Sequence, residues 1–104
     1  MAKRRSARPP LEVSEARRIL TVVNQRGLHA RASAKFVNAV SELPDGVTVR
    51  VAKGANEAGG GSILGLMMLG AAKGDTIEVI VAGDGRDAVL EQLCAMVEDG
   101  FGET

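Results

Sequence analysis

Aromatic side chains are almost absent from this chain of 104 residues, which has two phenylalanines, Phe36 and Phe101, and neither tryptophan nor tyrosine. The hydrophobic core must therefore consist mainly of Val, Leu, Ile, Met and Ala side chains. Proteins that bind single-stranded nucleic acids commonly stack bases on aromatic rings, and this chain has few rings to offer. We therefore expect no nucleic-acid partner.

Cysteine and histidine are equally scarce, with Cys94 and His29 as the only residues of their types. A lone cysteine excludes an intrachain disulfide and is typical of a reducing compartment, so we expect Cys94 to be a small buried hydrophobe. One histidine and one cysteine make a poor ligand set, and we expect no metal site and no cofactor. The longest apolar run, residues 63–72, is shorter than the roughly 20 residues that cross a bilayer. These absences predict a soluble, cytoplasmic protein with no membrane partner.

Charge is balanced overall, with 13 basic and 13 acidic residues, but it is unevenly distributed. Residues 1–18 contain six basic and two acidic residues, whereas the remainder contains seven and eleven. The first ten residues combine four positive charges with Pro9-Pro10 and lack the apolar stretch of a secretory signal. We predict a basic flexible tail at residues 1–15 and a single domain at residues 16–104. A basic arm that binds nucleic acid is the least favoured alternative.

Hydrophobic periodicity predicts an α+β domain with the element order β-α-β-β-α-β-α. Strand patterns occupy residues 19–23, 47–51, 55–58 and 76–82. Helix patterns run from residue 30 to the turn at 44–46, over residues 63–69, and from the turn at 83–85 to Gly100. This order is typical of a four-stranded antiparallel sheet with three helices on one face. The predicted buried positions are Ser33, Val37 and Val40 with Ala30, Ala34 and Phe36 near them, then Ile77, Val79 and Val81, and finally Val89, Leu93, Met96 and Val97.

His29 lies in the segment Gly27-Leu28-His29-Ala30-Arg31, between a strand pattern and a helix pattern. Unpaired N–H groups and the positive end of the helix dipole favour an anion at such a helix start. Arg31 would add a charge-assisted contact. The position suggests a phosphoryl-accepting imidazole, although a lone histidine that merely begins a helix is the alternative on the residues alone.

A second segment begins with Gly59-Gly60-Gly61 and Ser62, a favoured N-cap residue. The glycines lack the Gly-Lys-Ser/Thr ending of a nucleotide-binding loop, so we expect no nucleotide site. The helix predicted at residues 63–69 is apolar on nearly every face. A small two-layer domain cannot bury all of these faces, and we expect an exposed apolar patch for a partner protein.

The two segments together resemble the HPr family, the histidine phosphocarriers of the bacterial phosphotransferase system. Residues 27–31 resemble the active-site signature of the family, and residues 62–74 resemble its regulatory-serine helix with the following loop. The resemblance extends from about Arg18 to the C-terminus and implies the HPr-like open-faced β-sandwich with the element order predicted above. It also implies a monomeric stoichiometric carrier, not an enzyme, in which the Nδ1 atom of His29 receives a phosphoryl group from enzyme I and passes it to a histidine of an enzyme IIA-type protein.

The resemblance assigns roles to further residues. Arg31 is expected to orient the phosphoryl group and contact partners, with the backbone of Ala30 and Arg31 contacting the phosphoryl oxygens. Ser62 is expected to be a regulatory phosphosite for a serine-directed HPr kinase/phosphorylase. The expected docking residues beside His29 are Ile63, Leu64 and Met67, whereas Leu66 and Leu69 are expected in the core.

Two positions depart from the family pattern. Ala32 stands where the family more often has proline, so we expect a looser first helical turn with the site retained. Gly61 stands where the residue before the serine is often basic, which weakens the expectation of recognition by the kinase.

Two alternatives of function stay open on the sequence. One is a regulatory module of a nitrogen-type phosphotransferase branch, which would signal by its phosphorylation state instead of driving sugar uptake. The other is a small enzyme with His29 as general acid–base, which needs a concave pocket and a polar partner that orients the ring. We expect few candidates for that partner in this chain.

Overall fold

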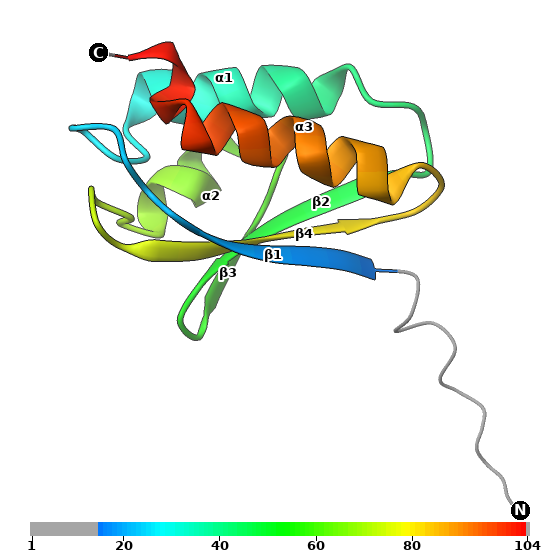
Figure 1. The fold of residues 1–104 in the computed structure, drawn as a ribbon, viewed down its shortest axis with the longest axis horizontal. Coiled ribbons are helices and arrows are strands. Elements are labelled where there is room, and N and C mark those ends of the chain that lie inside the picture. The colour runs from blue at the N-terminus through cyan, green and yellow to red at the C-terminus, as the bar shows by residue number, and fades with distance from the viewer. Residues whose placement is uncertain (1–14, 104) are drawn as a thin grey trace, which may run out of the picture.

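The computed structural model describes residues 15–103, which form a twisted sheet with helices packed on one of its faces (Figure 1). The sheet has the strand order β1-β4-β2-β3, and each neighbouring pair is antiparallel. The predicted open-faced sandwich and its element order are therefore confirmed, with a short 3-10 turn, η3, added after the last helix. The elements are β1 (Glu15–Thr21), α1 (Ala30–Ser41), β2 (Thr48–Lys53), β3 (Asn56–Gly59), α2 (Ile63–Met68), β4 (Thr76–Ala82), α3 (Arg86–Glu98) and η3 (Gly100–Gly102).

The first strand begins earlier than its apolar run predicts. The run at residues 19–23 marks only its end, whereas β1 extends from Glu15 and pairs along its whole length with β4, from Glu15↔Ala82 to Thr21↔Thr76. The charged first half of β1 joins the sheet because its side chains form ion pairs on the open face. The predicted end of the tail, residue 15, thus lies in a strand, and the rest of the predicted tail lies outside the described residues.

The core lies between the sheet and the helices and consists mainly of aliphatic side chains. Leu66 and Leu69 are buried, as predicted, and so is Cys94. On α1 the buried residues are Ala32, Ser33 and Phe36, so the prediction that Ala30 lies near the buried face is wrong. Ala30 is exposed because it is the first residue of the helix, whereas the buried residues begin at Ala32. The buried stripe of α3 comprises Val89, Leu90, Leu93, Cys94 and Val97.

The open face of the sheet hides one large apolar residue that the alternating pattern assigns to the solvent side. Ile80 is 2% exposed, although the core-facing residues of β4 are its odd-numbered neighbours. Its cross-strand neighbours are Arg17 on β1 and Arg50 on β2, and both arginines pair with Glu15. The ion pairs hold the aliphatic stems of the two arginines on either side of Ile80, which removes it from water.

Candidate functional site

His29 lies where the segment after β1 meets the segment after α2. The two segments are joined by backbone hydrogen bonds from Val22 N–H to Asp75 O (2.9 Å), from Gly74 N–H to Val22 O (2.8 Å) and from Leu28 N–H to Ala71 O (2.9 Å). Gly27 has a φ of +64°, and a Cβ atom at this position would lie 2.2 Å from the carbonyl oxygen of Ala71. Glycine alone allows both this conformation and this close approach. It therefore fixes the place of His29 beside α2.

His29 is the N-cap of α1 and has an extended backbone. Its Nδ1 atom accepts a hydrogen bond from the backbone N–H of Arg31 at 3.3 Å. Its carbonyl oxygen accepts from the N–H of Ser33, the first residue to donate within the helix. The prediction that His29 begins a helix is thus confirmed, and Nδ1 lies where backbone N–H groups and the helix dipole favour an anion.

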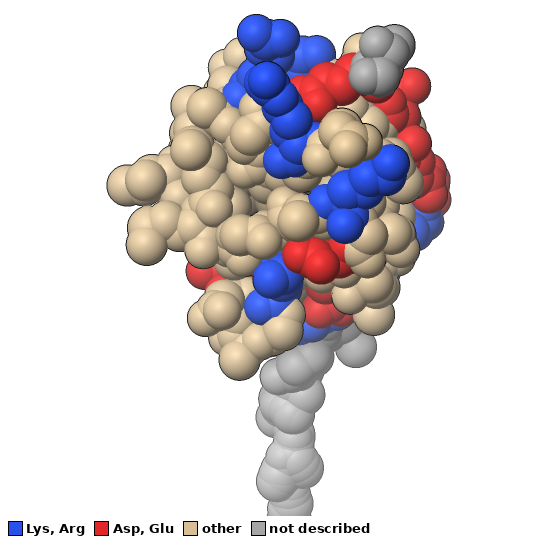
Figure 2. All heavy atoms as spheres, turned by 90° about the vertical axis from the view of Figure 1, so that its left-hand side faces the viewer, with Lys and Arg blue, Asp and Glu red and all other residues tan. Residues whose placement is uncertain are grey.

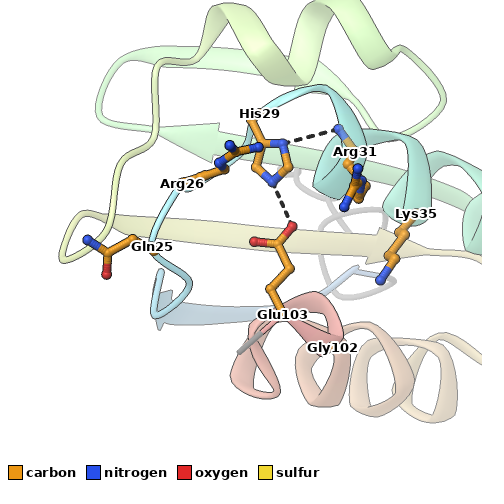
Figure 3. A pocket seen from close by; sticks show the side chains of 7 residues that line it. All are labelled: Gln25, Arg26, His29, Arg31, Lys35, Gly102 and Glu103. Carbon is orange, nitrogen blue, oxygen red and sulfur yellow. Dashed lines mark hydrogen bonds and ion pairs between the residues drawn. The ribbon is translucent and has the colours of Figure 1, made fainter.

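The other ring nitrogen is held by the C-terminal segment. His29 Nε2 lies 2.6 Å from Oε2 of Glu103, and the two side chains are 21% and 19% exposed. Both contacts of the ring are visible in Figure 3. A backbone N–H group can only donate, so Nδ1 carries no hydrogen and the ring hydrogen resides on Nε2, which donates to the carboxylate. The nitrogen with a free lone pair therefore faces the start of the helix.

Glu103 is fixed in turn by Asn24, a buried residue in the segment after β1. The side-chain amide of Asn24 donates to Oε1 of Glu103 at 3.1 Å and to the carbonyl oxygen of Gly27 at 2.8 Å. The hydrogen bonds from Asn24 and His29 hold the pKa of the Glu103 carboxyl below its usual value. Asn24 therefore links the glycine turn to an ionised carboxylate beside the ring.

The residues that bring Glu103 to the ring adopt an unusual backbone conformation. Gly100, Phe101 and Gly102 have φ values of +66°, +59° and +74°. A positive φ is unfavourable for phenylalanine, but its side chain is 2% exposed in the core. The carbonyl oxygen of Phe101 also accepts from Nζ of Lys35 on α1 at 2.6 Å. Burial and this hydrogen bond hold the turn against the helix that His29 begins.

An open pocket of about 630 Å³ surrounds the ring (Figure 3). Three cationic side chains and one carboxylate contribute to its wall, which favours an anionic occupant. Arg31 lines this pocket together with His29, whereas sequence reasoning missed Arg26, Lys35 and Glu103 in the lining and Asn24, which binds Glu103. Glu103 is the one described side chain that makes a hydrogen bond to the ring. The lining residues are Gln25, Arg26, His29, Arg31, Lys35, Gly102 and Glu103.

The predicted docking residues lie on α2, outside the lining of this pocket. Ile63, Leu64 and Met67 are 40%, 67% and 39% exposed, which confirms their predicted exposure. Met68, at 77%, is more exposed than any of them and was missed. Figure 2 shows an uncharged area on one side of this end of the molecule, with Lys and Arg side chains beside it. We call Ile63, Leu64, Met67 and Met68 the α2 patch.

Ser62 is exposed and is the N-cap of α2. Its Oγ atom accepts a hydrogen bond from the N–H of Gly65 at 2.9 Å. The hydroxyl group is thus next to the α2 patch and does not contact His29.

Residues 15–103 contain no group of three or more His, Cys, Asp or Glu side chains that could hold a metal ion. No helix in this part of the chain is long and apolar enough to cross a membrane. Cys94 is a free buried thiol, and burial raises its pKa.

Comparisons with known proteins show which family this chain is similar to. Residues 16–99 match the family model described as PTS HPr component phosphorylation site. The phosphocarrier protein NPr of Shewanella violacea is 36% identical, covering 88% of this chain and 98% of that protein. The phosphocarrier protein HPr of Neisseria meningitidis is 39% identical, covering 81% of this chain and 92% of that protein. The crystal structure of HPr from Thermoanaerobacter tengcongensis superposes with a TM-score of 0.79 at 29% identity, covering 86% of this chain and 98% of that one. The chain therefore belongs to the HPr family of phosphocarriers of the phosphotransferase system.

Proposed function

We propose that this chain accepts a phosphoryl group on Nδ1 of His29 from phospho-enzyme I and passes it to a histidine of an enzyme IIA-type protein. The orientation of the imidazole carries the proposal. Nδ1 has no hydrogen and faces the N-terminus of α1, whereas Nε2 carries the hydrogen and is held by Glu103. A neutral imidazole in this state is a nucleophile near neutral pH and needs no base to remove a proton first.

The start of α1 supplies groups that suit a phosphoryl group. The backbone N–H groups of Ala30 and Arg31 precede the first helical hydrogen bond. The Arg31 side chain lines the same pocket, where a guanidinium group pairs well with phosphate oxygens. The pocket is open, so a partner protein has to cover it during transfer. This supports a stoichiometric carrier and not an enzyme, because the partner would supply the groups on the open side of the transferred phosphoryl group.

The α2 patch and Arg31 form the proposed docking surface for both partners. The patch is apolar and exposed, and Figure 2 shows Lys and Arg side chains beside an uncharged area on this side of the molecule. A carrier must release each partner quickly, which favours a small interface of the transient kind. Exposed methionines suit such a surface because their flexible side chains adapt to more than one partner.

Ser62 is the proposed regulatory phosphosite, modified by a serine-directed HPr kinase/phosphorylase. A phosphate at this N-cap would stay near the N–H groups of α2, so the helix would tolerate it. It would also place about 1.5 to 2 negative charges beside the apolar patch. Modification would therefore weaken docking while leaving the fold intact.

The likeness to a phosphocarrier named NPr favours a second candidate. In this reading the same His29 chemistry serves a regulatory, nitrogen-type branch of the phosphotransferase system. The two candidates differ in their acceptors and not in the phosphorylated residue.

Incubation with enzyme I and labelled phosphoenolpyruvate tests the phosphorylation of His29. We expect one acid-labile, base-stable label per chain, with none in His29→Ala and normal labelling in the matched surface variant Ser62→Ala. Label that persists in a folded His29→Ala protein would refute the proposal. Transfer from the labelled protein to purified sugar-type and nitrogen-type IIA proteins, offered in parallel, then separates the two branches.

A further inference from the structure

We propose that Glu103 is a positioning residue of the carrier: its carboxylate keeps the hydrogen of His29 on Nε2 and stays paired with the ring while Nδ1 carries the phosphoryl group. The inference rests on the proposed function of His29 and adds a residue to it. Glu103 is remote in sequence, 74 positions after His29, and it contacts the ring on the side away from the reacting nitrogen.

The contact distances show which interaction holds the ring. The Nε2–Oε2 distance is 2.6 Å, within the range of a charge-assisted hydrogen bond, whereas the Arg31 N–H lies 3.3 Å from Nδ1. The second carboxylate oxygen of Glu103 is occupied by Asn24 at 3.1 Å, which restrains the rotation of the carboxylate. The strong contact is thus at Nε2, and the weak contact at Nδ1 is readily replaced by a phosphoryl group.

Among the described residues that line the pocket, Glu103 is the one with a carboxylate. Arg26, Arg31 and Lys35 contribute positive charge, and among the described lining residues Glu103 alone contributes negative charge. A cationic ring in this pocket would be unfavourable without it. Glu103 therefore compensates for the charge that the ring gains during the reaction.

The transfer step keeps the ring hydrogen in place. The Nδ1 lone pair of His29 forms a bond to phosphorus as the N–P bond of the donor phosphohistidine breaks, and that electron pair returns to the donor ring. No proton leaves His29, so its ring holds both the Nε2 hydrogen and the phosphoryl group and becomes an imidazolium. The Glu103 carboxylate faces that cation. In the onward step the Nδ1–P bond breaks toward the acceptor histidine, and the ring returns to its neutral state.

The path of the chain supports a dedicated role for this contact. Phe101 and Gly102 both have a positive φ, and the next residue, Glu103, contacts the ring. The Phe101 side chain is anchored in the core and its carbonyl oxygen binds Lys35. A local strain that the surroundings fully enforce is typical of segments with a functional task.

The test compares Glu103→Gln and Glu103→Ala with Glu98→Gln, an exposed glutamate of α3 that undergoes the same loss of charge. In the unphosphorylated full-length protein, ¹⁵N NMR of the imidazole should show hydrogen on Nε2 only. In Glu103→Ala only the weak contact from Arg31 N–H to Nδ1 remains, so both tautomers should be populated and the shifts of the two ring nitrogens should move toward each other. Identical ring shifts in wild type and Glu103→Ala would overturn the proposal.

Phosphoryl exchange with enzyme I provides the second measurement. We expect both Glu103 variants to hold about tenfold less phosphoryl group at equilibrium, as loss of a charge-assisted contact to the ring implies, and Glu98→Gln to match wild type. Equal phosphorylation of Glu103→Gln and Glu98→Gln would refute the role of Glu103. An unlabelled wild-type protein would instead refute the proposed function, which distinguishes the two failures.

Discussion

Replacing Gly27 by alanine tests whether the turn before His29 is fixed by a backbone contact. The residue has a φ of +64°, and the added Cβ atom would lie 2.2 Å from the carbonyl oxygen of Ala71 and 2.9 Å from Cα of Ala72. Both neighbours are backbone atoms, so no side-chain rotation can relieve the overlap. The segment after β1 or the segment after α2 has to move.

The expected cost has two parts. An L-residue in the left-handed region costs about 1–2 kcal/mol. Separation of the two segments also weakens the Leu28 N–H···O Ala71 hydrogen bond, worth about 0.5–1.5 kcal/mol. We expect Gly27→Ala to lower the free energy of unfolding by about 1.5–3.5 kcal/mol, which is a large share of the roughly 5–15 kcal/mol of a small domain.

Gly54→Ala is the matched control, because its φ of +59° is nearly the same and nothing lies within 4 Å of the added Cβ atom. It should show the conformational cost alone, about 1–2 kcal/mol. Urea denaturation of both variants measures the difference, and the slope should stay unchanged. Equal destabilisation of the two variants would refute the view that close packing against Ala71 places His29.

Three further predictions concern the α2 patch, Ser62 and Glu103. Leu64→Lys should weaken binding of enzyme I, measured by calorimetry, by roughly 1–3 kcal/mol with little loss of stability. Leu66→Ala should instead lower the denaturation midpoint in melting curves. A destabilised Leu64→Lys protein with normal binding would show that the exposed and buried faces of α2 were misassigned. Ser62→Asp should weaken enzyme I binding, unlike Ser62→Ala, and equal affinities would exclude this control. In NMR titrations the Glu103 carboxyl should show a lowered pKa that rises in Asn24→Ala, so its contribution to stability is lost as the pH falls through that lowered value.

Features encoded by neighbouring residues were predictable from the sequence. The strand at residues 76–82 has its predicted bounds, because its alternation and flanking glycines are local signals. His29 at a helix start follows from the change of pattern around Gly27-Leu28, and the exposure of Leu64 follows from a helix with more apolar faces than a small domain can bury.

Features that depend on the path of the whole chain were not predictable in this way. Asn24 and Glu103 are 79 positions apart and meet only because α3 returns to the start of α1. The Gly-Phe-Gly run before Glu103 offered a signal, since one of only two aromatic residues stands there between glycines. This run predicts a turn that is anchored by the phenylalanine, but it does not predict that Glu103 contacts the ring of His29.

Strand pairing and helix phase determine two further features that the sequence analysis did not predict. Ile80 reads as a solvent-facing residue, and only the pairing of β4 with both β1 and β2 shows that arginine stems cover it. Met68 is the last residue of α2, which has six residues. In so short a helix, a shift of its predicted end by one residue changes which side chains are expected to be exposed.

Hydrogen bonds join the segments around residues 22–28 and 71–75, and they affect how a partner bound to the α2 patch would be positioned relative to His29. In-line phosphoryl transfer needs the attacking nitrogen placed to within a fraction of an ångström, because misplacement by about 1 Å can cost a hundredfold in rate. The α2 patch and His29 are on different elements, so a partner docked on the patch would position the ring only if the two moved as one body. Asp75 strengthens this connection, since its backbone accepts from Val22 while its side chain accepts from Ala72 N–H at 2.9 Å. If the α2 patch is the docking surface, we expect these hydrogen bonds to hold Nδ1 at a fixed offset from a bound partner.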